Sequence, residues 1–254
     1  NSQFASTPVS SPEEIVGPNG EPLDYRLKMD IIYPSRPERP VPLVFWVSTQ
    51  TQRAASLRPQ AGHSRALFAG FTLRGYAFAN IDHAYNPLAF AYGHFEPGYS
   101  LDDWNGLKAY TAAIRFIRAH SAQFGIDPDY IGGFGHSKGA YALARLSDPN
   151  HEDQDEWFRF SGYPAGSPEP QPWPGYSSRI SVSYQSMGNG TRRHERLVSP
   201  DDVPTVIAAG EFDQYGHWSY WPDLVRTYED RDVPHIAFSL YGLGHQLPLG
   251  FDEE

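Results

Sequence analysis

Residues 130–146 read YIGGFGHSKGAYALARL. The centre of this segment, GHSKG at residues 135–139, fits the pattern G-x-S-x-G. The apolar residues of 130–134 predict a strand, and the small apolar residues of 139–146 predict a helix. A serine in such a sharp strand-to-helix turn is held in a strained backbone conformation above a sheet, and the flanking glycines let strand and helix approach closely. Ser137 is therefore the predicted nucleophile.

Glycine-rich turns between a strand and a helix also occur in nucleotide-binding folds, which is the structural alternative for this motif. Neither G-x-G-x-x-G nor G-x-x-x-x-G-K-[ST] occurs in the chain, and the G-x-S-x-G pattern occurs once. We therefore expect a serine nucleophile at this turn and no cofactor.

A serine hydroxyl is a weak nucleophile and needs a nearby base that an acid holds in place. In proteins with this turn the chain order is serine, acid, histidine, and the last two follow later strands. Asp213 follows the apolar run 205–209, and His245 follows the apolar run 235–241. Asp213 is thus the predicted acid and His245 the predicted base. Glu211, which leaves the same strand two residues earlier, is the alternative acid.

Other polar residues are weaker candidates. His217 lies four residues after Asp213, His235 begins a predicted strand, and His136 directly precedes Ser137. Four residues on loops after one predicted strand could be drawn as a metal site: Asp82, His83, His94 and Glu96. No helix fixes two ligands of this group on one face, so we interpret them as solvated loop residues and expect no metal.

The negative charge that develops on a reacting carbonyl needs two backbone N–H donors. Lys138, at the start of the helix after the serine, is the first predicted donor. The second comes from the loop after the predicted strand 43–47, so Thr49 is the preferred candidate and Gln50 the next. A plain polar turn is the alternative interpretation of that loop.

Strand-like and helical segments alternate along the chain. The predicted strands are 23–33, 43–47, 76–81, 130–134, 180–184, 205–209 and 235–241, and the predicted helices are 64–74, 100–120, 139–146 and 218–228. This alternation is typical of an α/β fold with a mostly parallel central sheet and helices on both faces. Residues 1–254 are expected to form a single domain, with residues 1–20 as a loose leader or an edge segment.

Residues 148–178 interrupt this alternation, because their prolines prevent a long helix. The stretch is also rich in Trp and Tyr, and a loop of this length in a compact domain usually has a function. We interpret it as a wall or lid near the site, with Trp173 in contact with substrate. Trp218 and Trp221, shortly after Asp213, are predicted to form the opposite wall. The alternative is that these rings pack against the core.

The composition excludes several kinds of protein. The net charge is −10 and no basic stripe is present, so nucleic-acid binding is not expected. The absence of cysteine excludes disulfides, Cys-ligated zinc and a thiol nucleophile. No stretch approaches the roughly 20 apolar residues of a membrane span. A start at Asn1 fits a removed signal segment or a shortened chain, so a secreted or periplasmic location is expected, with a cytoplasmic one as the alternative.

The sequence resembles the α/β-hydrolase superfamily, in particular small bacterial esterases related to acetylxylan esterases, feruloyl esterases and dienelactone-hydrolase-like proteins. Four segments carry the resemblance: LDYRLKMDIIYP (23–34), AAIRFIRAHSAQFGIDPDYIGGFGHSKGA (112–140), SPDDVPTVIAAGEFD (199–213) and YGLGHQ (241–246). The resemblance implies the α/β-hydrolase fold and a triad of Ser137, His245 and Asp213, in agreement with the spacing argument.

One departure concerns the oxyanion loop. These relatives usually carry a His-Gly-Gly type motif after the oxyanion strand, whereas this chain has Val47-Ser48-Thr49. The subfamily and the substrate are therefore left open by the resemblance.

A serine carboxylic-ester hydrolase that works through an acyl-enzyme is the expected function. Its partner would be a small-molecule or polysaccharide ester with a short acyl chain, such as an acetyl or feruloyl group on a plant polysaccharide. A polyester hydrolase, a lactonase or a serine peptidase of the same fold are the alternatives, and a non-catalytic carbohydrate-binding protein is a further one. The sequence leaves the oligomeric state open.

Overall fold

The computed structural model describes residues 5–9, 15–16, 22–23, 27–34, 37–47, 68–81, 101–151, 173, 175–187, 197–213 and 217–245. Within these residues, an eight-stranded sheet has the order β1-β4-β6-β5-β7-β8-β9-β10, and β2 pairs with β3. The strands are β1 (Ala5–Val9), β2 (Ile15–Val16), β3 (Pro22–Leu23), β4 (Leu27–Ile32), β5 (Val41–Val47), β6 (Ala77–Ile81), β7 (Ile126–His136), β8 (Val182–Ser186), β9 (Thr205–Gly210) and β10 (His235–Leu240).

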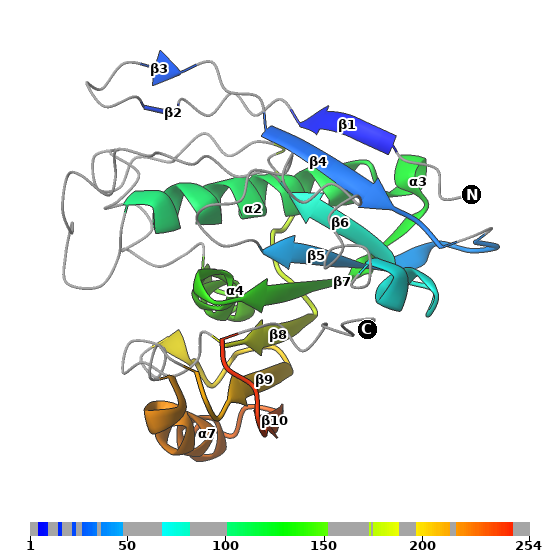
Figure 1. The fold of residues 1–254 in the computed structure, drawn as a ribbon. Helices are drawn as coiled ribbons and strands as arrows, with labels where there is room; N and C mark the ends of the chain where they lie inside the picture. The colour runs from blue at the N-terminus through cyan, green and yellow to red at the C-terminus, as the bar shows by residue number, and fades with distance from the viewer. Residues whose placement is uncertain are drawn as a thin grey trace.

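The sheet is mostly parallel, as the alternating pattern predicts. β1 and β4 pair antiparallel with each other, and β4 pairs antiparallel with β6. From β6 across to β10, every neighbouring pair of strands is parallel. Figure 1 shows this succession of strands from β1 at one edge to β10 at the other.

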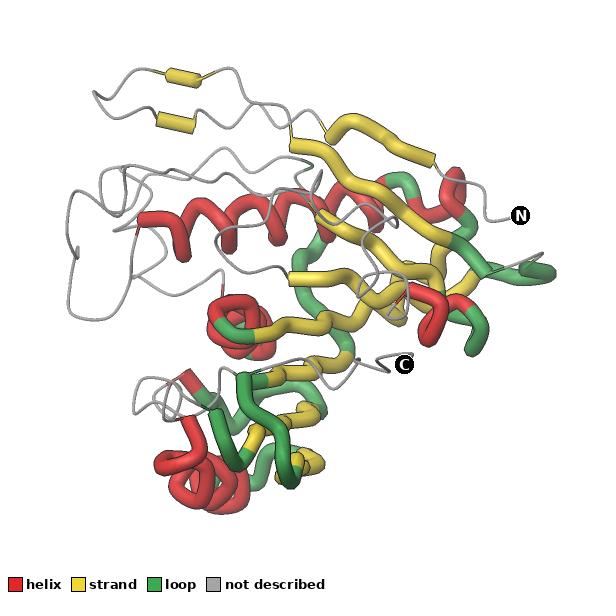
Figure 2. Tube along the Cα trace, viewed as in Figure 1, coloured by secondary structure: helices red, strands yellow, loops and turns green. Residues whose placement is uncertain are grey.

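Helices cover both faces of the sheet. They are α2 (Leu101–Ala119), α3 (Ser121–Phe124), α4 (Lys138–Ser147) and α7 (Trp221–Asp230), preceded by the 3-10 turn η3 (His217–Tyr220). α2, α4 and α7 lie on one side, and the helical segment at residues 68–72 lies on the other (Figures 1 and 2). The predicted α/β fold class is thereby confirmed.

β5 is buried on both faces, which explains its wholly apolar sequence. Phe45 belongs to the core cluster that contains Leu143 of α4. Val44 and Trp46 belong to the cluster on the opposite face, together with Phe68. This strand therefore lies at the centre of the molecule, with core on either side.

Ala5–Val9 forms the edge strand β1, which matches the edge-segment alternative for residues 1–20. The start of β7 differs from the sequence-based expectation. β7 begins at Ile126, four residues before the predicted start, because the GIDPD turn lies inside the strand as an irregularity rather than before it. Of residues 148–178, the structure describes 148–151, 173 and 175–178, so the wall or lid role stays a prediction.

The parallel sheet brings the ends of distant segments together. The carboxyl ends of parallel strands meet at one edge of a sheet, and this edge is the usual location of sites in such folds. Ser137 directly follows β7, Asp213 follows β9 and His245 follows β10. The fold therefore places all three residues at the same edge.

Candidate active site

Ser137 connects β7 to α4 in a strained conformation. Its φ of 55° and ψ of −122° lie in a region that residues other than glycine rarely adopt. A Cβ atom at Gly135 would lie 2.4 Å from the carbonyl oxygen of Gly139, so only glycine fits where strand and helix cross. The Ser137 N–H donates to the carbonyl oxygen of Ser186 at the end of β8, 2.9 Å away. These contacts hold the turn in the geometry that the motif predicts.

A second glycine extends this close packing down the strand. A Cβ atom at Gly133 would lie 2.3 Å from Cδ1 of Leu143, which packs from α4 onto β7. The alternation of glycines along β7 therefore lets α4 lie directly on the strand. As a result, the first turn of α4 is fixed next to Ser137.

The loops that carry the acid and the histidine are in direct contact. The N–H of Phe212 donates to the carbonyl oxygen of Leu243 at 2.9 Å. A Cβ atom at Gly210 would lie 2.4 Å from the same oxygen and 2.5 Å from that of Gly244. Glycine at position 210 thus allows the two loops to cross at the ends of β9 and β10.

His245 lies between the other two predicted residues. Its Nδ1 is 2.7 Å from Oδ2 of Asp213, and its Nε2 is 2.8 Å from Oγ of Ser137. Both contacts are satisfied by the tautomer in which Nδ1–H donates to the carboxylate and Nε2 accepts from the serine hydroxyl. The Asp213 side chain is 1% exposed and that of His245 is 13% exposed. This arrangement can remove a proton from Ser137 and hold the resulting imidazolium beside a buried carboxylate.

The alternative residues do not make these contacts. Glu211 is half-buried, and its backbone N–H donates to the Leu240 carbonyl oxygen at 3.3 Å. His235 begins β10, where its Nδ1 lies 2.8 Å from the carbonyl oxygen of Val233. His136 is buried, with its ring 5.1 Å from the ring of His245. Among the candidates, Asp213 is the acid whose carboxylate reaches His245.

Met187 contributes to the site in a way that the sequence analysis missed. Its φ is 52°, its side chain is fully buried, and its Sδ accepts the N–H of Gly210 at 2.9 Å. Its own N–H donates to the carbonyl oxygen of Ala208 at 2.9 Å. Met187 therefore ties the end of β8 to the end of β9, just before the acid. A methionine after an apolar strand carries no local signal for such a role.

Of the predicted oxyanion donors, the structure describes Lys138 but not Thr49 or Gln50. Lys138 is the first residue of α4, so its N–H lies in the first turn, where backbone N–H groups have no acceptor within the helix. Thr49 and Gln50 lie outside the described residues. The location of the second donor stays a prediction.

The three tryptophans predicted to contact substrate have different surroundings. Trp173 is 4.9 Å, centroid to centroid, from Phe116 of α2 and packs against the core. Trp221 is buried in the cluster between α7 and β9, with Leu224. Trp218 is half-buried and stacks on Trp221 at 6.3 Å. Each of these rings has protein contacts, and their contact with substrate stays a prediction.

The described residues contain neither a cluster of metal ligands nor a membrane-spanning helix. Among those side chains, no three His, Cys, Asp or Glu residues gather closely enough to hold a metal ion. The predicted loop residues Asp82, His83, His94 and Glu96 lie outside that part of the chain. Within the described ranges, no helix combines the length and the hydrophobicity needed to cross a bilayer.

Comparison with known proteins adds a family and a set of similar structures. The model of the BD-FAE family matches residues 29–159, about half of the chain. Gut esterase 1 of Caenorhabditis briggsae is 32% identical over 123 residues, which are 48% of this chain and 21% of that protein. The chain thus spans about a fifth of the length of this curated relative.

Two solved structures share the fold. A truncated form of a carbohydrate esterase from gut microbiota superposes with a TM-score of 0.64 and 16% identity, covering 95% of this chain and 89% of that one. Propionate-bound esterase 2 of Thermogutta terrifontis superposes with a TM-score of 0.61 and 18% identity, covering 87% of this chain and 80% of that one. At this level of identity the similarity identifies the α/β-hydrolase fold.

Proposed function

The chain belongs to the BD-FAE family and has the α/β-hydrolase fold, and we propose that it is an esterase that cleaves carboxylic esters through an acyl-enzyme on Ser137. The observation that supports this proposal is the position of His245, whose two ring nitrogens contact Asp213 at 2.7 Å and Ser137 at 2.8 Å. The three residues come from three separate strand ends, and their chain order is the one expected for this fold.

The proposed reaction has two halves. Oγ of Ser137 bonds to the ester carbonyl carbon while its proton moves to Nε2 of His245. The ester C–O bond then breaks, and the alcohol leaves with that proton. Water, deprotonated by the same nitrogen, attacks the acyl group and releases the acid and the free serine. Asp213 accepts the Nδ1–H throughout, and the N–H of Lys138, with that of Thr49 or Gln50, stabilises the oxyanion.

Active-site labelling tests this assignment. Ser137→Ala is expected to abolish labelling by a fluorophosphonate and to remove several orders of magnitude of p-nitrophenyl acetate turnover, because nothing else in the proposed mechanism forms the acyl bond. Ser239→Ala is the matched control, since Ser239 is exposed on β10. Normal labelling of the Ser137→Ala protein, with a circular dichroism spectrum like that of the wild type, would contradict the assignment.

We further propose that the substrates are short-chain acyl esters of saccharides. Two observations support this class: the similar solved structures include a carbohydrate esterase and an esterase with bound propionate, and the half-buried Trp218 follows Asp213 by five residues in the sequence. The test is kcat/KM across p-nitrophenyl acetate to laurate, acetylated xylan, methyl ferulate, a lactone and a peptide. The proposal expects acetate and acetylated xylan to be the best substrates. A steady rise towards laurate, or a preference for the lactone or peptide, would contradict it.

A further inference from the structure

β5 and β7 lose register near their amino-terminal ends. Val41 pairs with Ile126, and the next pair is Leu43 with Ile131. One residue of β5, Pro42, therefore faces the four residues 127–130 of β7. Proline has no N–H to give to a neighbouring strand, so a central strand tolerates it only at such an irregularity. The result is a bulge near the amino-terminal end of β7, whereas Ser137 follows the carboxyl-terminal end of the same strand.

The bulge is held in place by an arginine. Nε of Arg118, in the last turn of α2, donates to the carbonyl oxygen of Pro128 at 3.0 Å. The same guanidinium donates to the carbonyl oxygens of Ser177 and Arg179, in the segment that leads to β8. The bulge and this neighbouring segment are thereby fixed relative to each other. A wall that is already rigid loses little conformational entropy when a ligand binds.

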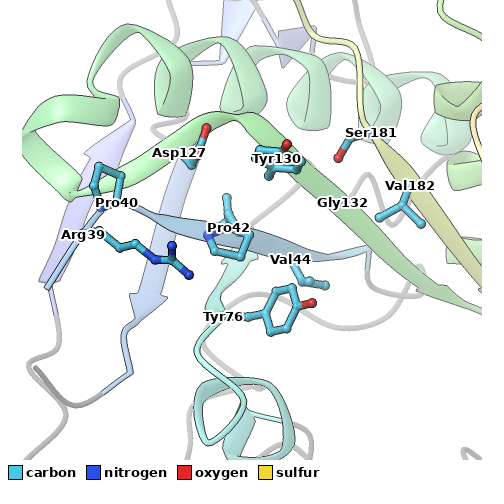
Figure 3. A pocket seen from close by; sticks show the side chains of 11 residues that line it. Arg39, Pro40, Pro42, Val44, Tyr76, Asp127, Tyr130, Gly132, Ser181 and Val182 are labelled. Atoms are coloured by element: carbon cyan, nitrogen blue, oxygen red, sulfur yellow. The ribbon is translucent and has the colours of Figure 1, made fainter. Parts of the chain in front are cut away.

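An open cavity of about 430 Å³ lies beside the bulge. Its size falls within the usual range for small-molecule sites. Figure 3 shows Pro42 and Val44 of β5 lying between the ring of Tyr76 on one side and Tyr130 on the other. Tyr130 is 61% exposed and Tyr76 is 39% exposed. Two tyrosine side chains thus line the cavity and remain partly exposed to solvent.

The polar side chains of the cavity indicate the class of ligand. Arg39 and Asp127 line the same cavity, so their charges balance. Asp127 accepts the N–H of Asp129 through Oδ1 at 3.1 Å, which orients the carboxylate. The hydroxyl of Ser181 donates to the carbonyl oxygen of Ile131 at 3.1 Å, which leaves its oxygen able to accept a hydrogen bond. Paired donors and acceptors of opposite charge suit the hydroxyl groups of a neutral polyol better than an anion, especially on a protein with a net charge of −10.

We propose that this cavity binds one or two sugar rings of a neutral oligosaccharide. The tyrosine rings and Pro42 offer flat apolar surfaces for the C–H face of a pyranose, and Arg39 and Asp127 hydrogen-bond its hydroxyl groups. Tyr130 of the cavity lining precedes Ser137 by seven residues along β7, roughly 20 Å. It is therefore a second, non-catalytic binding site, and binding there does not depend on ester hydrolysis.

The test is isothermal titration of the full chain with xylohexaose, cellohexaose and mannohexaose, none of which carries an ester. At least one of these oligosaccharides is expected to bind at millimolar concentration. Tyr130→Ala and Arg39→Ala should each weaken that binding about tenfold or more. The same variants should turn over p-nitrophenyl acetate like the wild type, because the cavity is at the opposite edge of the sheet from Ser137.

Tyr176→Ala is the matched control, because Tyr176 is 45% exposed and lies outside the cavity lining. It should bind the oligosaccharide as the wild type does. The proposal is overturned if none of the three oligosaccharides binds, or if Tyr130→Ala and Arg39→Ala bind as tightly as Tyr176→Ala. Loss of ester hydrolysis in Tyr130→Ala or Arg39→Ala would contradict a binding site that is separate from Ser137, whereas the Ser137→Ala variant tests only the proposed function.

Discussion

Gly210 and Leu243 are so close that a Cβ atom on Gly210 would lie 2.4 Å from the Leu243 carbonyl oxygen. Real Cβ atoms do not approach oxygen this closely, so the contact requires glycine. Gly210 ends β9, three residues before Asp213, and Leu243 is two residues before His245. The geometry of the acid and the histidine therefore depends on a backbone contact outside the proposed triad.

Gly210→Ala should separate these two loops. The added methyl group must displace the Leu243 carbonyl, and overpacking of this kind costs about 1–3 kcal/mol. We expect kcat/KM for p-nitrophenyl acetate to fall by at least about tenfold, since a displacement of the catalytic groups of about 1 Å can cost more than this. The control is Gly70→Ala, whose Cβ would meet nothing closer than Arg74 Nη1 at 3.9 Å. Equal activity of the two variants would show that the contact is not needed.

The identity of the acid is tested by two matched amide substitutions. Asp213→Asn keeps the side-chain shape but removes the charge that faces Nδ1 of His245, so kcat should fall by about 10³-fold or more. Glu211→Gln should leave kcat within about twofold, because it keeps the side-chain shape and the carboxylate that contacts His245 is that of Asp213. If Glu211→Gln is the inactive variant and Asp213→Asn is active, the wrong carboxylate has been assigned.

The sequence is most informative where residue type and position are both constrained. Glycines 135 and 139 flank Ser137 because strand and helix cross there, and this constraint makes the turn recognisable without a structure. Asp213 and His245 follow apolar runs that become β9 and β10, so their common edge could be expected from the parallel sheet alone. The contacts at 2.7 and 2.8 Å agree with that expectation.

Other features depend on partners far away in the chain. The residues of β1 include Ser, Thr and Pro, and they form a strand because β4 is available for pairing, which no local pattern reveals. Residues 127–130 carry the polar signature of a turn, yet the strand continues on both sides of them because Ile126 pairs with Val41. The role of Met187 rests on its contacts with two residues of β9, the N–H of Gly210 and the carbonyl oxygen of Ala208. Such features require the three-dimensional structure.

Asp202 gives the protein a pH-dependent stability. Its carboxylate is buried, and both of its oxygens are shielded from solvent. Burial raises the pKa of this group from 3.8 to about 7, and the charges of Asp148 and Asp201 add to the effect, while the Ser199 backbone and Arg231 oppose it. The folded state therefore holds a proton on Asp202 at pH values where the unfolded chain has released it.

The direction of the effect follows from proton linkage. Because the pKa is higher in the folded state, the contribution of Asp202 to the free energy of unfolding is largest below about pH 4 and falls as the pH rises to about 7. Asp202→Asn should abolish this decrease in the free energy of unfolding with rising pH. Its stability relative to the wild type should therefore be greater at pH 8 than at pH 5, by a few kcal/mol, or roughly 10 °C in Tm.

Urea unfolding at pH 5 and pH 8 measures this difference. Asp230→Asn is the control, because Asp230 is exposed and is not among the charges that shift the pKa of Asp202, so its removal should change stability equally at both pH values. An Asp202→Asn protein with the same relative stability at pH 5 and pH 8 would mean that Asp202 is ionised in the folded protein throughout this range.

Alanine substitutions of Trp218 and Trp221 should distinguish a side chain that contacts substrate from one that only packs in the core. The two rings stack at 6.3 Å with an interplanar angle of 17°, but Trp221 is buried in the cluster with Leu224 and Tyr228, whereas Trp218 is half-buried at the start of η3. Trp221→Ala is expected to lower the free energy of unfolding by about 3–5 kcal/mol, as for other large core truncations. Trp218→Ala is expected to cost less stability and to lower kcat/KM for acetylated xylan or methyl ferulate more than for p-nitrophenyl acetate. This difference between substrates is the useful measurement, because a purely structural defect would lower all three in proportion. Proportional losses in Trp218→Ala would assign the ring to the core and remove it from the proposed substrate wall.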